Sequence, residues 1–186
     1  MNTSTNNSTH QHKKNTHGPY NFFLVTISTS RAEKYGKVNG TVANPEDTDD
    51  MSGQVMRDII TQNGHRVVKY SLISDELNQI QDTVRSATET DTDIIITSGG
   101  TGLALRDITI ESIIPMLDKE MPGFGELFRY KSIQQIGTSV ILTRAIAGVI
   151  KNKAIFCLPG SPNAVRLALD EIIIPEAGHI IKHTKE

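Results

Sequence analysis

The chain has 186 residues, and its 19 basic and 21 acidic side chains give a formal net charge of −2. This balance argues against a nucleic-acid partner and against a membrane surface. A single cysteine, Cys157, excludes an internal disulfide and argues against a thiolate metal site. No segment approaches the roughly 18 consecutive apolar residues of a membrane span, so we expect a cytoplasmic protein.

The first 18 residues form a polar segment that contains no apolar side chain beyond Met1. A segment of this composition cannot bury enough apolar surface to offset the entropy of ordering it. We therefore expect a disordered tail over residues 1–18 and a single folded domain over residues 19–186.

Short apolar segments alternate with segments of helical periodicity along the rest of the chain. Buried strands are predicted at 21–28, 65–73, 93–97 and 153–159. Helices are predicted at 51–64, 109–120, 125–137 and 161–174, and one more begins after Ser74 or Asp75, either of which can act as its N-cap. A polar loop is expected between the first strand and residue 51.

Residues 139–150 fit a helix or a strand, with a strand favoured at 147–150. The strand segments are apolar without alternation, which is typical of a parallel sheet covered on both faces. Strands that alternate with helices at this spacing predict the α/β class, with a three-layer α/β/α sandwich around a mostly parallel sheet.

The predicted strand at 93–97 runs into a glycine-rich segment, TSGGTG, at residues 97–102. Glycines let successive backbone N–H groups approach an anion closely, and the hydroxyls of Ser98 and Thr101 add donors. The spacing matches neither a P-loop nor the G-x-G-x-x-G fingerprint. On spacing alone, an anion cradle and a structural turn fit this segment equally well.

Asp75 and Asp107 are both expected at the carboxyl edge of the sheet, after adjacent strands, where open α/β sheets bind ligands. Two carboxylates beside an anion cradle would repel the ligand unless a hard cation such as Mg²⁺ lay between them. The alternative is that Asp75 caps one helix and Asp107 begins another. Arg106 and Arg144 are the nearest basic candidates, and either could equally be a surface ion-pair partner.

Two further glycine-containing turns open predicted helices. In MPGFGE, at residues 121–126, Glu126 can lie in the first helical turn, where the helix dipole favours a negative charge. In LPGSP, at residues 158–162, Gly160 and Ser161 expose backbone donors suited to an anion, although N-capping alone would explain Ser161.

Two histidines, His179 and His183, lie four residues apart on the predicted terminal helix, so both rings could face one metal ion. No third ligand is evident nearby in the sequence, and the alternative is a pair of solvated surface residues.

Taken together, DDMSGQ, TSGGTG with RDIT downstream, MPGFGE and LPGSP resemble the MogA/MoaB family of molybdenum-cofactor biosynthesis proteins in their order and spacing. The resemblance covers roughly residues 21–181 and includes the fold of the gephyrin G domain. It implies Mg²⁺-dependent adenylylation of molybdopterin by ATP, which gives molybdopterin-AMP and pyrophosphate. The segment 126–149 is most similar to MoaB, whereas Arg106–Asp107 and the complete PGFGE resemble the active MogA type.

By this resemblance, Asp75 and Asp107 are the two functional aspartates, assigned here to catalysis through a bound Mg²⁺. The implied substrate-binding residues are Ser98, Gly99, Gly100, Thr101, Gly102, Gly125, Glu126, Pro159, Gly160 and Ser161. Asp50 matches a family position at a helix start, where capping is expected. Thr29 and Ser30 depart from the usual Ser-Asp pair of the family.

The resemblance also implies a homotrimer or homohexamer, and hand-off of the product to a metal-insertion protein of the MoeA type. Two alternatives to the enzyme stay open. One is a non-catalytic molybdopterin carrier of the MoaB type, and the other is a CinA-like nucleotide-binding domain.

Overall fold

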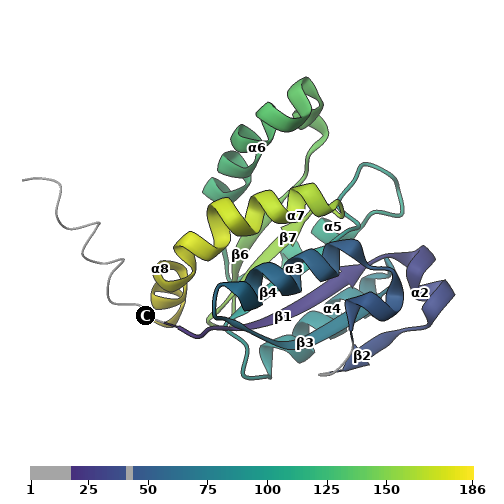
Figure 1. Cartoon of the computed structure of the whole chain (residues 1–186), viewed down its shortest axis with the longest axis horizontal. Helices are drawn as coiled ribbons and strands as arrows, with labels where there is room; N and C mark the ends of the chain where they lie inside the picture. Colours follow the sequence, from purple (N-terminus) through teal and green to yellow (C-terminus); the bar gives the residue numbers. More distant parts are fainter. Residues whose placement is uncertain (1–17, 41–43) are drawn as a thin grey trace, which may run out of the picture.

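The computed structural model describes residues 18–40 and 44–186. The tail expected over residues 1–18 lies outside the described residues except for Gly18. A sheet of strand order β2-β3-β1-β4-β7-β6-β5 forms the centre of the molecule (Figure 1). Its strands are β1 (Asn21–Ile27), β2 (Val38–Gly40), β3 (Arg66–Ile73), β4 (Ile94–Ser98), β5 (Lys119–Glu120), β6 (Ile146–Ile150) and β7 (Lys153–Leu158).

The four central strands β3, β1, β4 and β7 run parallel to one another, whereas β2, β5 and β6 pair antiparallel with their neighbours. The main helices are α2 (Thr29–Tyr35), α3 (Met51–Gln62), α4 (Leu77–Thr88), α5 (Thr109–Ile113), α6 (Pro122–Ile136), α7 (Pro162–Ala168) and α8 (Ile174–Lys185). Short turns of other helix types are η1 (Pro45–Thr48), η2 (Ile114–Met116), η3 (Gly137–Leu142) and η4 (Leu169–Ile173). None of these helices is long and apolar enough to cross a membrane within the described ranges.

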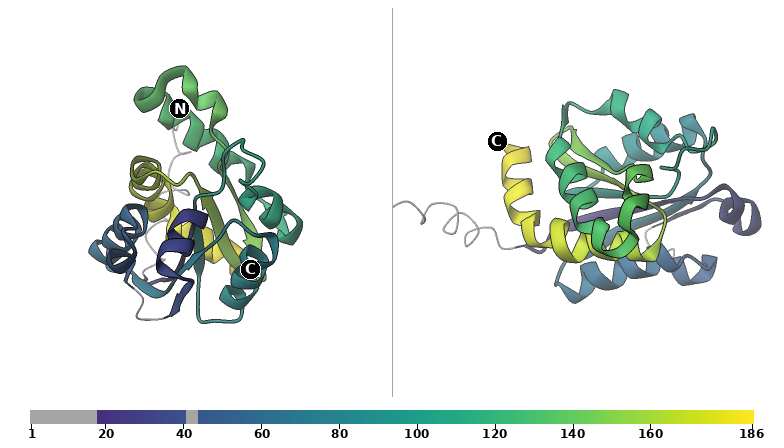
Figure 2. Two further views of the ribbon diagram at one scale, coloured as in Figure 1. Left: turned by 90° about the vertical axis from the view of Figure 1, so that its right-hand side faces the viewer. Right: turned by 90° about the horizontal axis from the view of Figure 1, so that it is seen from above.

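Successive side chains of β1 enter two separate hydrophobic cores. Phe22 and Leu24 pack with residues of α3, α6, α7 and α8, while Phe23 and Val25 pack with α4 and α5 on the opposite face. Figure 2 shows the same arrangement from above, with α3 and α7 on one side of the sheet and α4 on the other. Because both faces are covered, the central strands can be apolar throughout. The three-layer α/β/α sandwich with a mostly parallel sheet is therefore confirmed.

The predicted polar loop before residue 51 is wrong in part, because it contains α2 and β2. Within α2 only Ala32 is buried, so the segment carries no apolar periodicity to reveal a helix.

Three helix boundaries also differ from the sequence prediction. The helix predicted at 109–120 ends as α5 and η2 before the short strand β5, and α6 begins at Pro122, ahead of the predicted start. The helix after β3 has Glu76 as its N-cap position, so neither Ser74 nor Asp75 caps it.

The carboxyl ends of the parallel strands meet along one edge of the sheet. However, β1 lies between β3 and β4, so Asp75 and Asp107 do not follow adjacent strands as the sequence analysis expected. The chain crosses over so that β1 lies between β3 and β4. The order of strands within a sheet depends on such crossovers and does not follow from the order of motifs along the sequence.

Candidate functional site

The turn after β4 requires glycine at two successive positions. Gly99 has φ 106° and Gly100 has φ 62°, in the region that residues with a side chain rarely adopt. A Cβ on Gly99 would overlap the Ile27 carbonyl oxygen, and a Cβ on Gly100 would overlap Asp75 Oδ1 and Thr109 Oγ1. The backbone of this turn therefore lies directly against the end of β1 and against the first aspartate.

Thr109 fixes the turn from the other side. Its hydroxyl donates to the Gly99 carbonyl at 2.9 Å, and its backbone N–H donates to the Gly100 carbonyl at 2.9 Å. The residue is fully buried at the start of α5. The sequence alone does not reveal this role of Thr109, whose only signal is its position within RDIT.

Asp75 is held at the turn by Thr29. The Thr29 hydroxyl donates to Asp75 Oδ2 at 3.2 Å, and the Asp75 backbone N–H donates to the same hydroxyl at 3.1 Å. The other carboxylate oxygen, Oδ1, is buried and has no hydrogen-bond partner.

Burial raises the pKa of Asp75 above its ordinary value, and the charge of Asp107 raises it further. Hydrogen bonds from Thr29 and the charge of Arg106 lower this pKa. A buried carboxylate oxygen without a donor is costly, and a cation bound to it would offset that cost.

Asp107 lies on the same turn, because a Cβ on Gly102 would overlap Asp107 Oδ2. The side chain is half-buried, and its backbone N–H donates to the Ala104 carbonyl at 2.9 Å. Ile108, not Asp107, occupies the N-cap position of α5. The alternative in which Asp107 begins the helix is therefore wrong by two residues, and the two aspartates lie against Gly100 and Gly102 of one turn.

The chemistry of this pair fits Mg²⁺, which takes oxygen ligands and commonly uses one or two carboxylates. Within the described parts of the chain there is no cluster of three or more histidine, cysteine, aspartate or glutamate side chains arranged for a metal. Asp75 and Asp107 would thus leave the remaining positions around Mg²⁺ to water and substrate oxygens, as Mg²⁺ sites beside phosphates usually do.

The LPGSP loop packs against the TSGGTG turn. The Gly99 backbone N–H donates to the Leu158 carbonyl at 3.0 Å, and Ser98 Oγ lies 3.5 Å from the Pro159 carbonyl oxygen. Gly160 lies so close to the turn that a Cβ added to it would be 3.2 Å from the Gly99 Cα. Ser98, Gly99 and Thr101 are buried, whereas Gly100 and Gly102 are partly exposed and are the positions of the turn that a ligand can reach.

Ser161 caps α7, because its hydroxyl accepts a hydrogen bond from the Ala164 backbone N–H at 3.2 Å. The capping alternative is confirmed for this residue. A cavity of about 200 Å³ lies beside the loop, lined by Pro159, Ser161, Asn163, Ala164, Thr143 and four residues of α6. The loop thus separates the glycine turn from a small cavity under α6.

Gly125 and Glu126 lie in a different cavity of about 190 Å³, which also contains Arg129 and Ile146. None of its lining residues belongs to the TSGGTG turn, so the structure places Glu126 apart from the two aspartates. A Cβ on Gly125 would lie 2.7 Å from the Ala145 carbonyl oxygen, which explains the glycine. The expectation that Glu126 lies in the first helical turn is wrong, because α6 begins four residues earlier.

The two basic candidates differ in their surroundings. Arg144 donates to both carboxylate oxygens of Glu111, at 2.6 and 2.9 Å, so the ion-pair alternative is confirmed for it. Arg106 is exposed, and its charge acts on Asp75. Arg106 is therefore the basic group associated with the aspartate pair.

Asp50 occupies the N-cap position of α3, but its side chain makes no capping hydrogen bond, so the expected capping role is wrong. The side chain is fully buried and accepts hydrogen bonds from Thr26 and Tyr70. Burial, followed by the charge of Asp50, raises the pKa of Tyr70. This network joins the start of α3 to β1 and β3, next to Ser52, whose hydroxyl donates to the Gly160 carbonyl at 2.8 Å.

The chain is similar in sequence to proteins of one known family. A family model described as a probable molybdopterin binding domain matches residues 24–179. Molybdenum cofactor biosynthesis protein B of Halalkalibacterium halodurans is 45% identical over 177 residues, which cover 94% of this chain and 96% of that protein.

Two solved structures extend the comparison. The tungsten cofactor synthesizing protein MoaB from Pyrococcus furiosus superposes with a TM-score of 0.77 at 36% identity, covering 91% of this chain and 99% of that one. A structure of MogA has a TM-score of 0.73 at 26% identity, covering 88% and 99% of the two chains. Of these two structures, MoaB is the more similar in both measures.

Proposed function

Because the chain belongs to the family of probable molybdopterin binding domains and acts in molybdenum cofactor biosynthesis, we propose that it catalyses the adenylylation of molybdopterin by ATP. One observation carries this proposal. Asp75 lies against Gly100 and Asp107 against Gly102 of the same turn, and Asp75 presents a buried carboxylate oxygen that has no hydrogen-bond partner. A purely structural turn has no need of that arrangement, whereas a phosphoryl-transfer site has.

In this reaction a phosphate oxygen of molybdopterin attacks the α-phosphorus of ATP. A new P–O bond forms, the bond to the bridging oxygen of the β-phosphate breaks, and pyrophosphate leaves with its electron pair. The attacking phosphate is already an anion at neutral pH, so the reaction needs no general base. We therefore assign the aspartates to Mg²⁺ and not to proton transfer.

The protein has to bring two polyanions together, and their repulsion costs several kcal/mol even at a moderate effective dielectric. We assign phosphate binding to the backbone of Gly100 and Gly102, which are partly exposed, whereas Gly99 is buried and its N–H already donates to the Leu158 carbonyl. Mg²⁺ held by the two aspartates would neutralise part of the phosphate charge. Arg106 supplies a further positive charge, and correct positioning supplies much of the remaining rate.

Thr29, Thr109 and Ser52 act indirectly in this proposal. Each donates a hydrogen bond that fixes a site segment: the Asp75 carboxylate, the Gly99 carbonyl and the Gly160 carbonyl, respectively. Gly125 and Glu126 lie in a separate cavity, so we assign them to a part of the substrate remote from the reacting phosphate.

A non-catalytic molybdopterin carrier is the second candidate, and the greater similarity to the MoaB structure than to the MogA structure favours it. The deciding experiment incubates the protein with ATP, Mg²⁺ and molybdopterin and measures molybdopterin-AMP. An enzyme forms the product only when all three are present, whereas a carrier binds molybdopterin without consuming ATP. A CinA-like nucleotide-binding domain would bind nucleotide with no effect of molybdopterin.

We also propose that the protein forms a homo-oligomer through α6 and η3. Large apolar side chains are exposed along this segment, at Leu127, Tyr130, Ile133, Ile136, Ile141 and Leu142. Figure 2 shows α6 projecting at the end of the molecule, where a second copy can reach it. Several large exposed apolar side chains on one segment are typical of interaction sites. A trimer or hexamer, and hand-off of the product to a MoeA-type protein, stay predictions from the family resemblance.

A further inference from the structure

We propose that His179 and His183 form a binding site for a divalent transition metal on α8, separate from the magnesium site proposed above. The two residues are one helical turn apart, and their Nε2 atoms lie 3.0 Å from each other. Their rings meet edge to face, with centroids 4.7 Å apart and an interplanar angle of 67°. Both side chains are substantially exposed, so a metal ion can reach them.

The Glu186 carboxylate determines which ring nitrogen of His183 carries the proton. His183 Nδ1 lies 3.0 Å from Glu186 Oε2, and His179 Nδ1 lies 3.5 Å from a carboxylate oxygen of Glu176. A carboxylate only accepts hydrogen bonds, so the contact with Glu186 favours the tautomer of His183 with the proton on Nδ1. That tautomer leaves a lone pair on Nε2.

The two Nε2 atoms are within hydrogen-bond distance at 3.0 Å, so without a metal the Nε2–H of His179 donates to His183, and a metal ion would displace this proton. Metal-binding histidines commonly have this environment, with the second ring nitrogen donating to a carboxylate that orients the ring. With metal–nitrogen bonds of about 2.05 Å, this separation gives a nitrogen–metal–nitrogen angle of roughly 94°. Such an angle suits tetragonal Cu²⁺ or Ni²⁺ and is somewhat compressed for tetrahedral Zn²⁺.

The local charge also favours a cation. His183 lies in the last turn of α8, where the helix dipole is negative, and the pair is flanked by Glu176 and Glu186. Of the nearby cations, Lys185 is paired with Asp93 at 2.7 Å and Lys182 lies 3.9 Å from Glu186.

Two imidazoles leave the other coordination positions to water, since the described residues provide no cluster of three or more such ligands. An open site of this kind binds metal reversibly, whereas closed four-ligand sites stabilise a fold.

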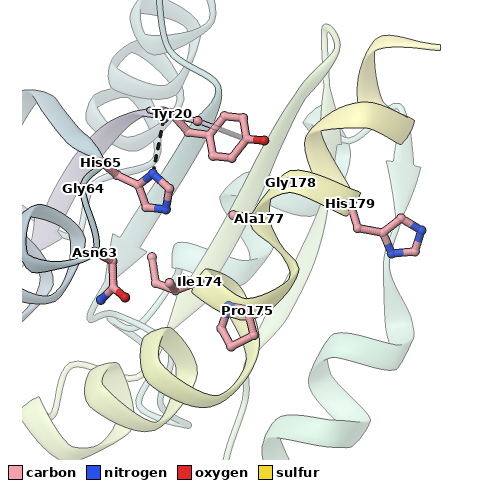
Figure 3. Close-up of a pocket in the computed structure, with 10 residues that line it drawn as sticks. Tyr20, Asn63, Gly64, His65, Ile174, Pro175, Ala177, Gly178 and His179 are labelled. Carbon is pink, nitrogen blue, oxygen red and sulfur yellow. Dashed lines mark hydrogen bonds between the residues drawn. The ribbon is translucent and has the colours of Figure 1, made fainter. Parts of the chain in front are cut away.

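The site is at the opposite edge of the sheet from the TSGGTG turn. Lys185 reaches Asp93, which immediately precedes β4, whereas the turn follows β4. A pocket of about 330 Å³ is lined by both His179 and His65, and His65 Nδ1 accepts a hydrogen bond from the Tyr20 backbone N–H at 3.3 Å. Figure 3 shows that the His179 ring points away from His65. His65 is therefore a matched control imidazole.

The test uses the full chain with His10, His12 and His17 replaced by asparagine. These three histidines lie close together in the N-terminal segment, outside the described residues, and could bind metal themselves. Cu²⁺ is the probe, since it is the strongest binder among the first-row divalent metals. Calorimetry should give one Cu²⁺ per chain, and electron paramagnetic resonance should show coupling to two nitrogens.

In that background, His183→Asn should weaken Cu²⁺ binding by at least tenfold. Glu186→Gln, which removes only the orienting carboxylate, should weaken it about tenfold. His65→Asn should leave the affinity unchanged, and circular dichroism checks that each variant stays folded.

Two results would overturn the proposal. One is a tail-substituted chain that binds no Cu²⁺, which would place all binding on the tail. The other is a His179→Asn, His183→Asn double variant that still binds one Cu²⁺ with unchanged affinity. Neither result bears on the proposed adenylylation, which is measured with Mg²⁺ and depends on residues at the other edge of the sheet.

Discussion

Thr29 and Asp75 are joined by two hydrogen bonds through a single hydroxyl, which donates to the Asp75 carboxylate and accepts from the Asp75 backbone N–H. These two hydrogen bonds connect the first residue of α2 to the segment after β3. It leaves only one oxygen of the carboxylate, Oδ1, available for a cation at the glycine turn. A threonine that departs from the usual family pattern therefore orients a proposed metal ligand.

Replacing Thr29 by valine keeps the shape of the side chain and removes both hydrogen bonds. We expect adenylylation to fall about tenfold, the equivalent of one lost hydrogen bond to a charged group. The pKa of Asp75 should rise further, because the lost bond favours the ionised form. The acidic limb of the pH–rate profile should therefore move to higher pH, and Thr29→Ser should restore it. An unchanged profile in the valine variant would show that Thr29 does not orient Asp75.

Asp75→Asn should stabilise the protein while it abolishes the effect of Mg²⁺. Folding raises the pKa of the Asp75 carboxyl group above its unfolded value, near 3.8. The group therefore stabilises the fold at pH values below 3.8, and this stabilisation is lost as the pH rises through the higher pKa of the folded protein. Above that window the unpaired charge costs stability, so the variant should gain up to about 1 kcal/mol at pH 7.

Chemical denaturation across pH measures this gain, which should disappear in acid. Mg²⁺ should raise the melting temperature of the wild type and leave that of the variant unchanged. An equal response of both proteins to Mg²⁺ would remove Asp75 from the metal site.

Gly100→Ala should disrupt the site directly. The new Cβ would overlap Asp75 Oδ1 and Thr109 Oγ1, and the positive φ adds backbone strain. We expect a loss of roughly 1–3 kcal/mol in stability together with loss of adenylylation. Gly123→Ala is the matched control, because a Cβ there would meet nothing within 4 Å. Equal stability and activity in the two variants would contradict the packing described for the turn.

The apolar surface of α6 and η3 gives a prediction about assembly. Replacing Ile133 and Ile141 by lysine places two charges on that surface, and we expect the oligomer to dissociate to a chain of 20.4 kDa. Light scattering measures the mass. Leu77→Lys, at an exposed apolar position on α4, is the control and should leave the oligomer intact. A wild-type protein that is already monomeric would contradict the prediction.

The sequence predicted the central strands, α3, α4 and α7, because their apolar patterns follow from burial on the sheet. It did not predict α2, in which a single alanine is buried. It placed both aspartates at the correct edge of the sheet but not their separation by β1, since strand order depends on crossovers.

The hydrogen-bond partners were also beyond sequence reasoning. The hydroxyls of Thr29 and Thr109 have many possible partners along the chain, and only tertiary packing brings one to Asp75 and the other to Gly99. The same holds for Arg144, whose pairing with Glu111 decides between two interpretations that the sequence left equal.

The most direct test of the proposed enzyme concerns Asp107. Asp107→Asn keeps the side-chain shape against Gly102 and removes the charge assigned to Mg²⁺. The measurement is single-turnover formation of molybdopterin-AMP, with equilibrium binding of molybdopterin as its companion. We expect binding to change little and adenylylation to fall by roughly 10²-fold or more, the scale of losing one well-placed electrostatic contribution. Near-normal turnover by the asparagine variant would contradict a catalytic role for the aspartate pair and leave the TSGGTG segment as a structural turn.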